Sequence, residues 1–448
     1  MKYTTATAIL SLALFFSCQK EDDLDRLGDV DFSRPAAIGG SMMSGYQDGA
    51  LYPKGQEKSI PQLFFDRVAE HGGGSFSTPV MSNNDGVGVN PKPWTSIFQT
   101  RSRLNMRTDC EGVESLGPVK SLYQNTGLSD LDQSSSNVNG QYQCAPFATL
   151  ERMLDPNFGL SYNDGNPYPY YHRAASNPGV STMIGEIVDY NPSFLLGWFG
   201  MEEVVSYAQT GGTSNTLMDP IVFEQRLDSV LSIISANGTK GALINIPDVK
   251  ELPYFQLVQY NGANLDETQA ADLNQLYTAS NANHINFNVG PNPFICEDPD
   301  APQGLRHLKN GELLTLTVPL DSMKCQLYGL FGRFFKDQYY LSLDEVSMLD
   351  QAILSYNATI AKLAEKYDLA LVDANSFYTT VDSGIMWDGA GFSFEFVTGG
   401  FIGLDGIYPN QKGYALITNE IIESVNEHYG THIPNINCLD CDGVVFPE

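Results

Sequence analysis

The chain has 448 residues, of which 42% are hydrophobic and 11% aromatic, proportions typical of a globular protein and not of a disordered one. Its 53 acidic and 25 basic residues give a formal net charge of −28. A chain this acidic repels phosphate backbones, so nucleic-acid binding is not expected.

The first residues have the pattern of an exported lipoprotein. Lys2 precedes an apolar run that ends at Ser17 and Cys18 and is too short to anchor the chain across a bilayer. A small residue directly before a cysteine in this context resembles a bacterial lipobox. The resemblance implies that residues 1–17 are a signal peptide and that Cys18 is the lipidated first residue of the mature chain. The alternative is an ordinary signal peptide with an incidental cysteine.

An acidic segment follows the cysteine. Its sequence, QKEDDLD, resembles the surface-export signal of lipoproteins in the Bacteroidota, which implies a lipid anchor in the outer membrane and a protein that faces the cell exterior. The alternative is a solvated acidic tether without address information. We therefore expect residues 18–34 to form a tether and residues 35–448 to form a single domain.

Predicted strands and helices alternate from residue 35 onward. We expect strands near 35–41, 193–200, 242–248 and 369–375, and helices within 59–74, 181–192, 219–241, 342–368 and 410–430. The clearest helix begins with a capping box of Ser342 and Glu345. Its apolar residues are spaced three and four apart, as one face of a helix requires. They are Val346, Leu349, Ile353, Tyr356, Ile360 and Leu363.

This alternation predicts an α/β fold with a mainly parallel sheet that is covered by helices on both faces. Two stretches interrupt the pattern, residues 72–140 and residues 282–340. Both are rich in glycine, serine, asparagine or proline and have little periodicity. Long stretches of this kind usually bind something or form insertions with small elements of their own.

Six cysteines remain after Cys18, an even number that favours disulfides in an exported protein. Neighbours in sequence suggest the pairs Cys110–Cys144, Cys296–Cys325 and Cys438–Cys441, although six cysteines allow fifteen pairings. The last pair is a C-x-x-C, for which we expect a structural loop in preference to a redox or zinc site. No second C-x-x-C or histidine pair is nearby, so no metal or cofactor is expected.

Ser41 is the first candidate for chemistry. It follows a predicted strand and two glycines and precedes a helix, the place where a nucleophile is exposed at the carboxyl edge of a parallel sheet. The alternative is an ordinary turn or helix cap.

The segment GGSMMSGYQDGAL around Ser41 resembles the first block of the SGNH (GDSL-type) hydrolases, closest to a branch of long Bacteroidota lipoproteins. Similar segments follow in order across residues 35–435: PSFLLGWFGMEEVVSYAQTGG, GALINIPDVKELPYF, LALVDANSFY, FEFVTGGFIGLDGIYPNQKGYALITNEII and YGTHIP. The resemblance implies a three-layer α/β/α sandwich with a mainly parallel, flavodoxin-like sheet and long insertions.

The resemblance also assigns the catalytic positions. Ser41 matches the nucleophile, Asp405 matches the aspartate that orients the base, and Gly200 matches a family glycine. The other positions depart from the family. Gly40 replaces an aspartate or asparagine, Phe147 replaces the oxyanion glycine, Glu202 replaces the oxyanion asparagine, Tyr408 replaces the histidine base, and Met201 and Glu203 replace an asparagine and an aspartate. Gly179 is a competing match for the oxyanion glycine.

These replacements oppose the family's chemistry. An ionised Glu202 accepts hydrogen bonds and does not donate them, and its charge repels a developing oxyanion. A tyrosine with an ordinary pKa near 10 is a poor base at neutral pH. None of the six histidines, at 71, 172, 284, 307, 428 and 432, occupies the position of the base.

We therefore expect a catalytically inactive, surface-exposed lipoprotein, in which Ser41 and Asp405 are vestigial. It would act as a binding or accessory subunit, and an outer-membrane β-barrel is a plausible partner. The alternatives are an active esterase or lipase that uses Ser41 with Glu202 or Glu203 as a displaced base, and a glycan-binding module. The small number of tryptophans, Trp94, Trp198 and Trp387, does not favour the glycan-binding module.

Overall fold

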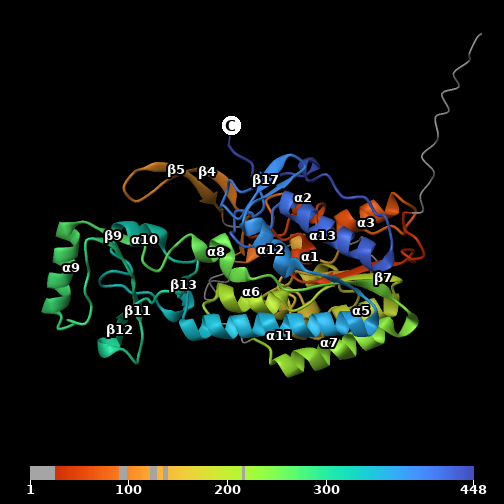
Figure 1. The fold of residues 1–448 in the computed structure, drawn as a ribbon, viewed down its shortest axis with the longest axis horizontal. Helices are drawn as coiled ribbons and strands as arrows, with labels where there is room; N and C mark the ends of the chain where they lie inside the picture. The colour runs from red at the N-terminus through yellow and green to blue at the C-terminus, as the bar shows by residue number, and fades with distance from the viewer. Residues whose placement is uncertain (1–25, 90–97, 122–128, 135–139, 214–216, 448) are drawn as a thin grey trace, which may run out of the picture.

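The computed structural model describes residues 26–89, 98–121, 129–134, 140–213 and 217–447. Its centre is a five-stranded sheet in which every pairing is parallel, so the predicted α/β class is confirmed (Figure 1). The strands are β1 (Pro35–Gly39), β6 (Tyr142–Cys144), β7 (Phe194–Trp198), β8 (Lys240–Ile244) and β15 (Ala370–Val372). The predicted signal peptide, Cys18 and the first part of the tether lie outside the described residues.

The strands lie side by side in the order β15-β8-β7-β1-β6. Numbered along the chain, this is the order 2-1-3-4-5 of flavodoxin-like doubly wound sheets. In such sheets ligands bind beyond the carboxyl ends of the strands, at the point where the winding direction reverses. That point lies here between β1 and β7, so the loops after Gly39 and Trp198 are the first place to look for a site.

Helices cover both faces of the sheet (Figure 1). On one face α3 (Ile60–Ala69) packs beside α13 (Gln411–Tyr429), and on the other α7 (Pro220–Ile234) lies between α5 (Met183–Tyr190) and α11 (Leu343–Tyr367). The predicted capping box of α11 is present, and five of the six stripe residues, from Leu349 to Leu363, are buried.

Shorter elements connect these layers. They are α1 (Ser41–Ser44), α2 (Pro53–Gln56), α4 (Leu150–Met153), α6 (Met201–Gln209), α8 (Pro253–Gln256), α12 (Ala374–Asp382), β2 (Gly88–Val89), β3 (Phe98–Gln99), β16 (Ile385–Trp387) and β17 (Ala390–Phe392). Within the described residues no helix combines the length and the apolar character needed to cross a membrane.

The domain begins earlier than predicted. Residues 26–34, predicted to be part of the tether, pack against the domain, because Leu27 and Phe32 are buried in its core. The backbone N–H of His432 also donates a hydrogen bond to the carbonyl of Arg26.

The second predicted insertion belongs to a lobe, residues 263–340, with a hydrophobic core of its own. The lobe extends to one side of the sheet (Figure 1). Leu273, Tyr277 and Phe335 are among its buried residues. Its elements are β9 (Ala263–Leu265), α9 (Glu267–Ala279), β10 (Gly290–Asn292), β11 (Ile295–Glu297), β12 (Leu305–His307), β13 (Leu313–Leu314) and α10 (Leu320–Cys325), and β14 (Tyr340–Leu341) closes it.

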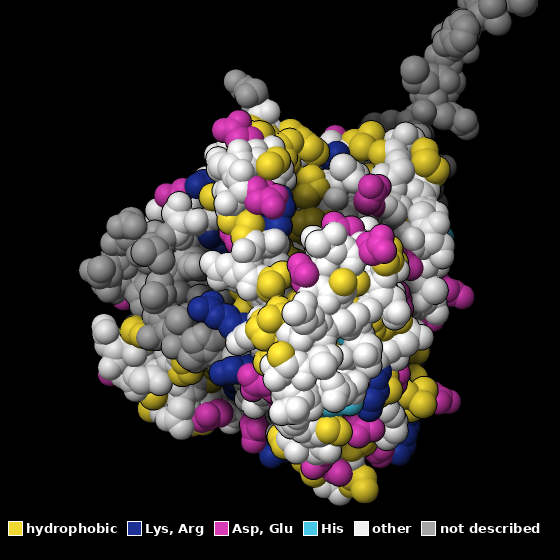
Figure 2. Space-filling view, turned by 90° about the vertical axis from the view of Figure 1, so that its left-hand side faces the viewer, with side chains coloured by type: hydrophobic (Ala, Val, Ile, Leu, Met, Phe, Trp, Pro, Cys, Tyr) yellow, Lys and Arg dark blue, Asp and Glu magenta, His cyan; other side chains and the backbone are white. Residues whose placement is uncertain are grey.

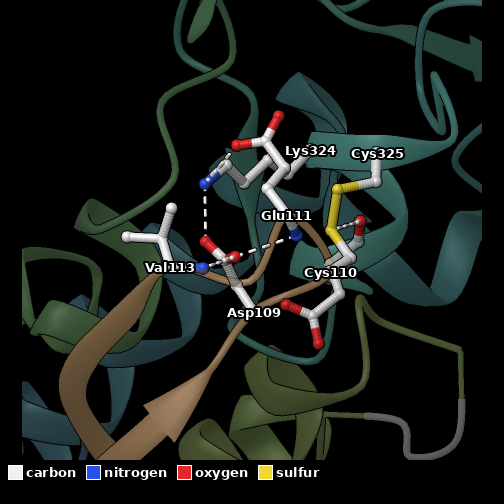
Figure 3. Close-up of a disulfide and its surroundings, with 7 residues drawn as sticks. Asp109, Cys110, Glu111, Val113, Lys324 and Cys325 are labelled. Atoms are coloured by element: carbon white, nitrogen blue, oxygen red, sulfur yellow. Dashed lines mark hydrogen bonds and ion pairs between the residues drawn. A yellow bond between two sulfur atoms is a disulfide. The ribbon is translucent and has the colours of Figure 1, made fainter.

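A disulfide joins the two insertions. The hairpin of β4 (Arg103–Thr108) and β5 (Glu114–Val119) carries Cys110 at its turn, and this cysteine is bonded to Cys325 of the lobe, 215 residues away (Figure 3). Lys324, next to Cys325, forms ion pairs with Asp109 and Glu111 on the hairpin.

The predicted cysteine pairings are wrong. Cys110 does not pair with Cys144, nor Cys296 with Cys325, and Cys438 and Cys441 are not bonded to each other. Cys144 is buried at the end of the edge strand β6 and Cys296 is buried in the core of the lobe, while their suggested partners, Cys110 and Cys325, are bonded to each other. Among the described residues, the four other cysteines are buried free thiols, namely Cys144, Cys296, Cys438 and Cys441.

Candidate functional site

The reversal point of the sheet holds Ser41. Strand β1 ends at Gly39, and after Gly40 the short helix α1 begins at Ser41. The side chain has no solvent exposure. A nucleophile that attacks a substrate has to be reachable from the solvent side of the sheet edge, and Ser41 is not.

Glu202 occupies the space beside the serine. The adjacent strand β7 leads through Gly200, whose φ of +84° suits a residue without a Cβ, into helix α6. Glu202 lies in the first turn of α6, and its Oε2 accepts a hydrogen bond of 2.9 Å from the backbone N–H of Ser41. The amide that could serve as an oxyanion donor at this serine is therefore already bonded to a carboxylate.

Phe147 lies on the other side of the serine. Its backbone N–H donates to the Oγ of Ser41 over 3.2 Å, and its carbonyl accepts a bond of 2.7 Å from Arg152. Phe147 has a φ of +65°, a region that favours glycine. A phenylalanine thus keeps a glycine-like backbone here. Gly179, the competing match for this position, instead lies against the side chain of Leu160.

Tyr408, in the loop that precedes helix α13, also borders the site. It is 2% exposed, and its ring meets that of Tyr46 edge-on at 5.2 Å. Asp405 holds the loop in shape, since its Oδ1 accepts the backbone N–H of Tyr408 at 2.8 Å and its Oδ2 accepts that of Gly49 at 2.7 Å. In this structure Asp405 therefore stabilises its loop by accepting hydrogen bonds from backbone amides.

Aromatic rings fill the space around the serine. The Phe147 ring packs within 6 Å of three tyrosine rings, and Tyr46 joins this group to Tyr408. The tyrosines around Phe147 are Tyr46, Tyr168 and Tyr170. The sequence analysis did not identify Tyr168 and Tyr170, although the aromatic run PYPYY that contains them was a visible signal.

The acidic groups of the site are perturbed by burial. Burial raises the pKa of Glu202, and hydrogen bonds from the backbone and side chain of Ser41 oppose that shift. Burial raises the pKa of Glu203 to about 7, although its Oε1 accepts the backbone N–H of Leu150 at 2.6 Å. Burial also raises the pKa of Tyr408 well above its ordinary value, so the phenol stays protonated at neutral pH.

Of the two carboxylates considered as displaced bases, Glu202 adjoins the serine, through the backbone N–H of Ser41. Glu202 Oε1 and the Tyr408 hydroxyl are both buried without a hydrogen-bond partner. Glu203 is directed to the backbone of Leu150 instead. Four histidine side chains are directed away from Ser41: those of His172, His284 and His307 contact the carbonyls of Gly159, Leu305 and Pro293, and that of His428 lies 3.3 Å from Asp368.

Gly40 and Glu202 fit each other. A Cβ added to Gly40 would lie 2.5 Å from Glu202 Oε2 and 3.3 Å from the carbonyl oxygen of Ala148. The Glu202 carboxylate occupies the space that a side chain at position 40 would need. The residues at positions 40 and 202 are therefore linked sterically, which the sequence alone did not reveal.

Within the described residues, no cluster of histidine, cysteine and acidic side chains has the arrangement of a metal site. Comparisons with protein-family models, with characterised proteins and with solved structures give no match to this chain.

Proposed function

We propose that this chain has an SGNH hydrolase-like three-layer α/β/α frame whose hydrolase site is closed. It would serve as a surface-exposed outer-membrane lipoprotein, anchored through Cys18, in a binding or accessory role. The frame is supported by the flavodoxin-like strand order and by the meeting of Ser41, Phe147, Glu202 and Tyr408 at its reversal point.

The proposed loss of hydrolase activity rests on one observation, which is that the amide of Ser41 is bonded to the carboxylate of Glu202. Acyl transfer needs donors aimed at a developing oxyanion. In this site the Ser41 amide is bonded to Glu202, and the Phe147 amide is bonded to the Ser41 hydroxyl. The position expected to hold the oxyanion asparagine is occupied by Glu202, whose ionised carboxylate only accepts hydrogen bonds. Losing one such donor typically costs about a hundred- to a thousand-fold in rate.

The alternative function, a serine esterase with Glu202 as the base, has less support. Glu202 does adjoin Ser41, and burial raises the pKa of its carboxyl group. The serine is nevertheless inaccessible, and Glu202 Oε2 is bonded to the backbone amide of Ser41, which is then not free to donate to an oxyanion.

A fluorophosphonate probe tests the closed site. We expect no labelling of the wild-type chain and no turnover of short-chain p-nitrophenyl esters. The matched control is Ser41→Ala, which keeps the fold and removes the nucleophile. A triple variant, Phe147→Gly with Glu202→Asn and Tyr408→His, restores the family pattern and is expected to be labelled. Labelling of the wild type that is lost in Ser41→Ala would contradict the proposal.

The membrane role is tested separately. Protease treatment of intact cells should degrade the wild-type protein, whereas Cys18→Ala should lose lipid labelling and membrane attachment. A partner, for which we propose a β-barrel protein, should copurify from gently solubilised outer membranes. Recovery of the wild-type chain alone as a monomer would count against the subunit role and leave the closed-site result unaffected.

A further inference from the structure

A pocket of about 290 Å³ lies apart from the closed serine site. Its walls come from the turn at residues 47–52, the segment 101–104 that enters β4, and the C-terminal tail at 442–447. Neither Ser41 nor Glu202 lines it. Small-molecule pockets usually span about 300–1,000 Å³, so this pocket has room for a ligand of about one ring.

Arg101 is held in the wall of this pocket with its two outer nitrogens unbonded. The guanidinium lies 4.7 Å over the centre of the Tyr52 ring, and its Nε donates a hydrogen bond of 2.8 Å to the carbonyl of Asn84. These two contacts fix the plane of the group. Within the described residues Nη1 and Nη2 donate no hydrogen bond, and neither is a buried atom without a partner, so both retain surface that a ligand can contact.

The acidic side chain nearest in charge to Arg101 is directed elsewhere. Asp48 is buried, its Oδ1 accepts from the backbone N–H of Leu404, and its Oδ2 accepts from the Tyr52 hydroxyl, each at 2.8 Å. Within the described residues Arg101 forms no ion pair, whereas Arg103 is paired with Asp85. The guanidinium of Arg101 is therefore available for a bidentate contact with an anion.

The remaining charges of the lining limit the charge of the ligand. Lys54 is paired with Asp442 at 3.7 Å, but the two side chains are 58% and 61% exposed, so the pair is weak and Lys54 can turn toward a bound anion. Asp48 and Asp442 both line the pocket and repel a second negative charge. The lining thus favours an anion that carries one charge over a dianion.

Another part of the lining is apolar. Leu104 and Leu404 contribute from the body of the protein, and the tail adds Val444, Val445 and Phe446. Val445 is 71% exposed and Phe446 is 51% exposed. Figure 2 shows hydrophobic side chains gathered at the top of the molecule, where the C-terminal tail lies. The pocket therefore offers a fixed cation together with apolar contact.

We propose that this pocket binds a small organic carboxylate whose apolar body is about one ring in size. The two carboxylate oxygens accept from Nη1 and Nη2 of Arg101, while the body packs on Leu104 and Phe446. An inorganic anion has no body for the apolar lining, and a neutral molecule has no charge for Arg101. The pocket uses no residue of the closed serine site, so this proposal stands independently of the proposed function.

A ligand-observed NMR titration of the full chain in a non-ionic detergent tests the proposal. The probes are benzoate, phenylacetate and hexanoate, and the matched controls are their amides, which have the same shape and no charge. Acetate and inorganic phosphate are added as anions without an apolar body. We expect at least one probe to bind, and its amide, acetate and phosphate to bind at least about tenfold more weakly, the effect of losing a charge-assisted hydrogen bond or the apolar contact.

Substitution of the arginine tests the assigned contact. Arg101→Gln should weaken binding of that carboxylate about ten- to a hundredfold, because hydrogen bonds to a charged group are lost. The matched control is Arg107→Gln, which removes the same charge from strand β4 at a position outside the pocket lining. It should leave the affinity within about twofold, since only a screened, distant charge is lost.

A second variant keeps the test valid if Arg101→Gln does not fold. Phe446→Ala alters only the exposed tail and should weaken binding of the same carboxylate severalfold. Its control, Leu354→Ala, removes an apolar side chain that is 74% exposed on α11 and should have no effect. Three results would each overturn the proposal: no binding of any probe, an amide or a bodiless anion that binds as tightly as the carboxylate, or unchanged affinity in Arg101→Gln or Phe446→Ala.

Discussion

Replacing Glu203 by glutamine should stabilise the protein at alkaline pH and have little effect at acidic pH. Glu203 is 5% exposed, and burial raises its pKa to about 7 from the ordinary value of 4.5. Its Oε1 accepts from the backbone of Leu150, while its Oε2 has no hydrogen-bond partner. Glutamine keeps an acceptor for Leu150 and carries no charge at any of these pH values.

The magnitude follows from the shift in pKa. A rise of about 2.5 units corresponds to about 3 kcal/mol of unfolding free energy. Between pH 4.5 and pH 7 the folded state holds a proton that the unfolded state has lost. Raising the pH through this window therefore lowers stability, by up to about 1.4 kcal/mol per pH unit, and the loss is complete above pH 7.

Urea denaturation at pH 5 and at pH 8 measures the effect, with the midpoint and slope fitted separately. Glu203→Gln should be more stable than the wild type by about 3 kcal/mol at pH 8 and by less than about 1 kcal/mol at pH 5. The control Glu427→Gln, at an exposed position of α13, should change stability equally at both pH values. An equal effect of Glu203→Gln at both pH values would refute the reasoning.

Three further substitutions test other features of the structure. Gly40→Ala should cost about 1–3 kcal/mol by overpacking against Glu202 Oε2, and a double-mutant cycle with Glu202→Ala should show that the cost is smaller once the carboxylate is removed. Phe147→Gly and Phe147→Ala remove the same ring, but the glycine variant should be more stable by about 1 kcal/mol, because only alanine is strained at a φ of +65°; equal stabilities in thermal denaturation would contradict this. Replacing Cys110 and Cys325 by serine should lower stability by up to about 4–5 kcal/mol, since the bond closes a loop of 215 residues, and reducing agent should affect the wild type and not the double variant.

The central sheet was predictable from the sequence because its signals are local. Buried parallel strands form short apolar runs. The helix Leu343–Tyr367 is predicted by its capping box and by the spacing of Leu349, Ile353 and Tyr356. The placement of Ser41 after the first strand was equally local. These features depend only on neighbouring residues, which one sequence contains in full.

The cysteine pairings could not be predicted in the same way. Cys110 and Cys325 are 215 residues apart, and each has a nearer cysteine in sequence. They meet because the hairpin and the lobe pack against each other, with Lys324 bridging Asp109 and Glu111. The early start of the domain, at Leu27 and Phe32, was missed for a similar reason, since the surfaces that bury these residues come from distant parts of the chain.

The sequence by itself therefore determined the α/β class and the main helices, because both are recorded in local pattern and composition. Only the tertiary structure decided that the Ser41 amide is bonded to Glu202, that Gly40 makes room for that carboxylate, and that Phe147 keeps a glycine-like backbone. These facts depend on distances between segments more than a hundred residues apart, which are set by the packing of strands β1 and β7.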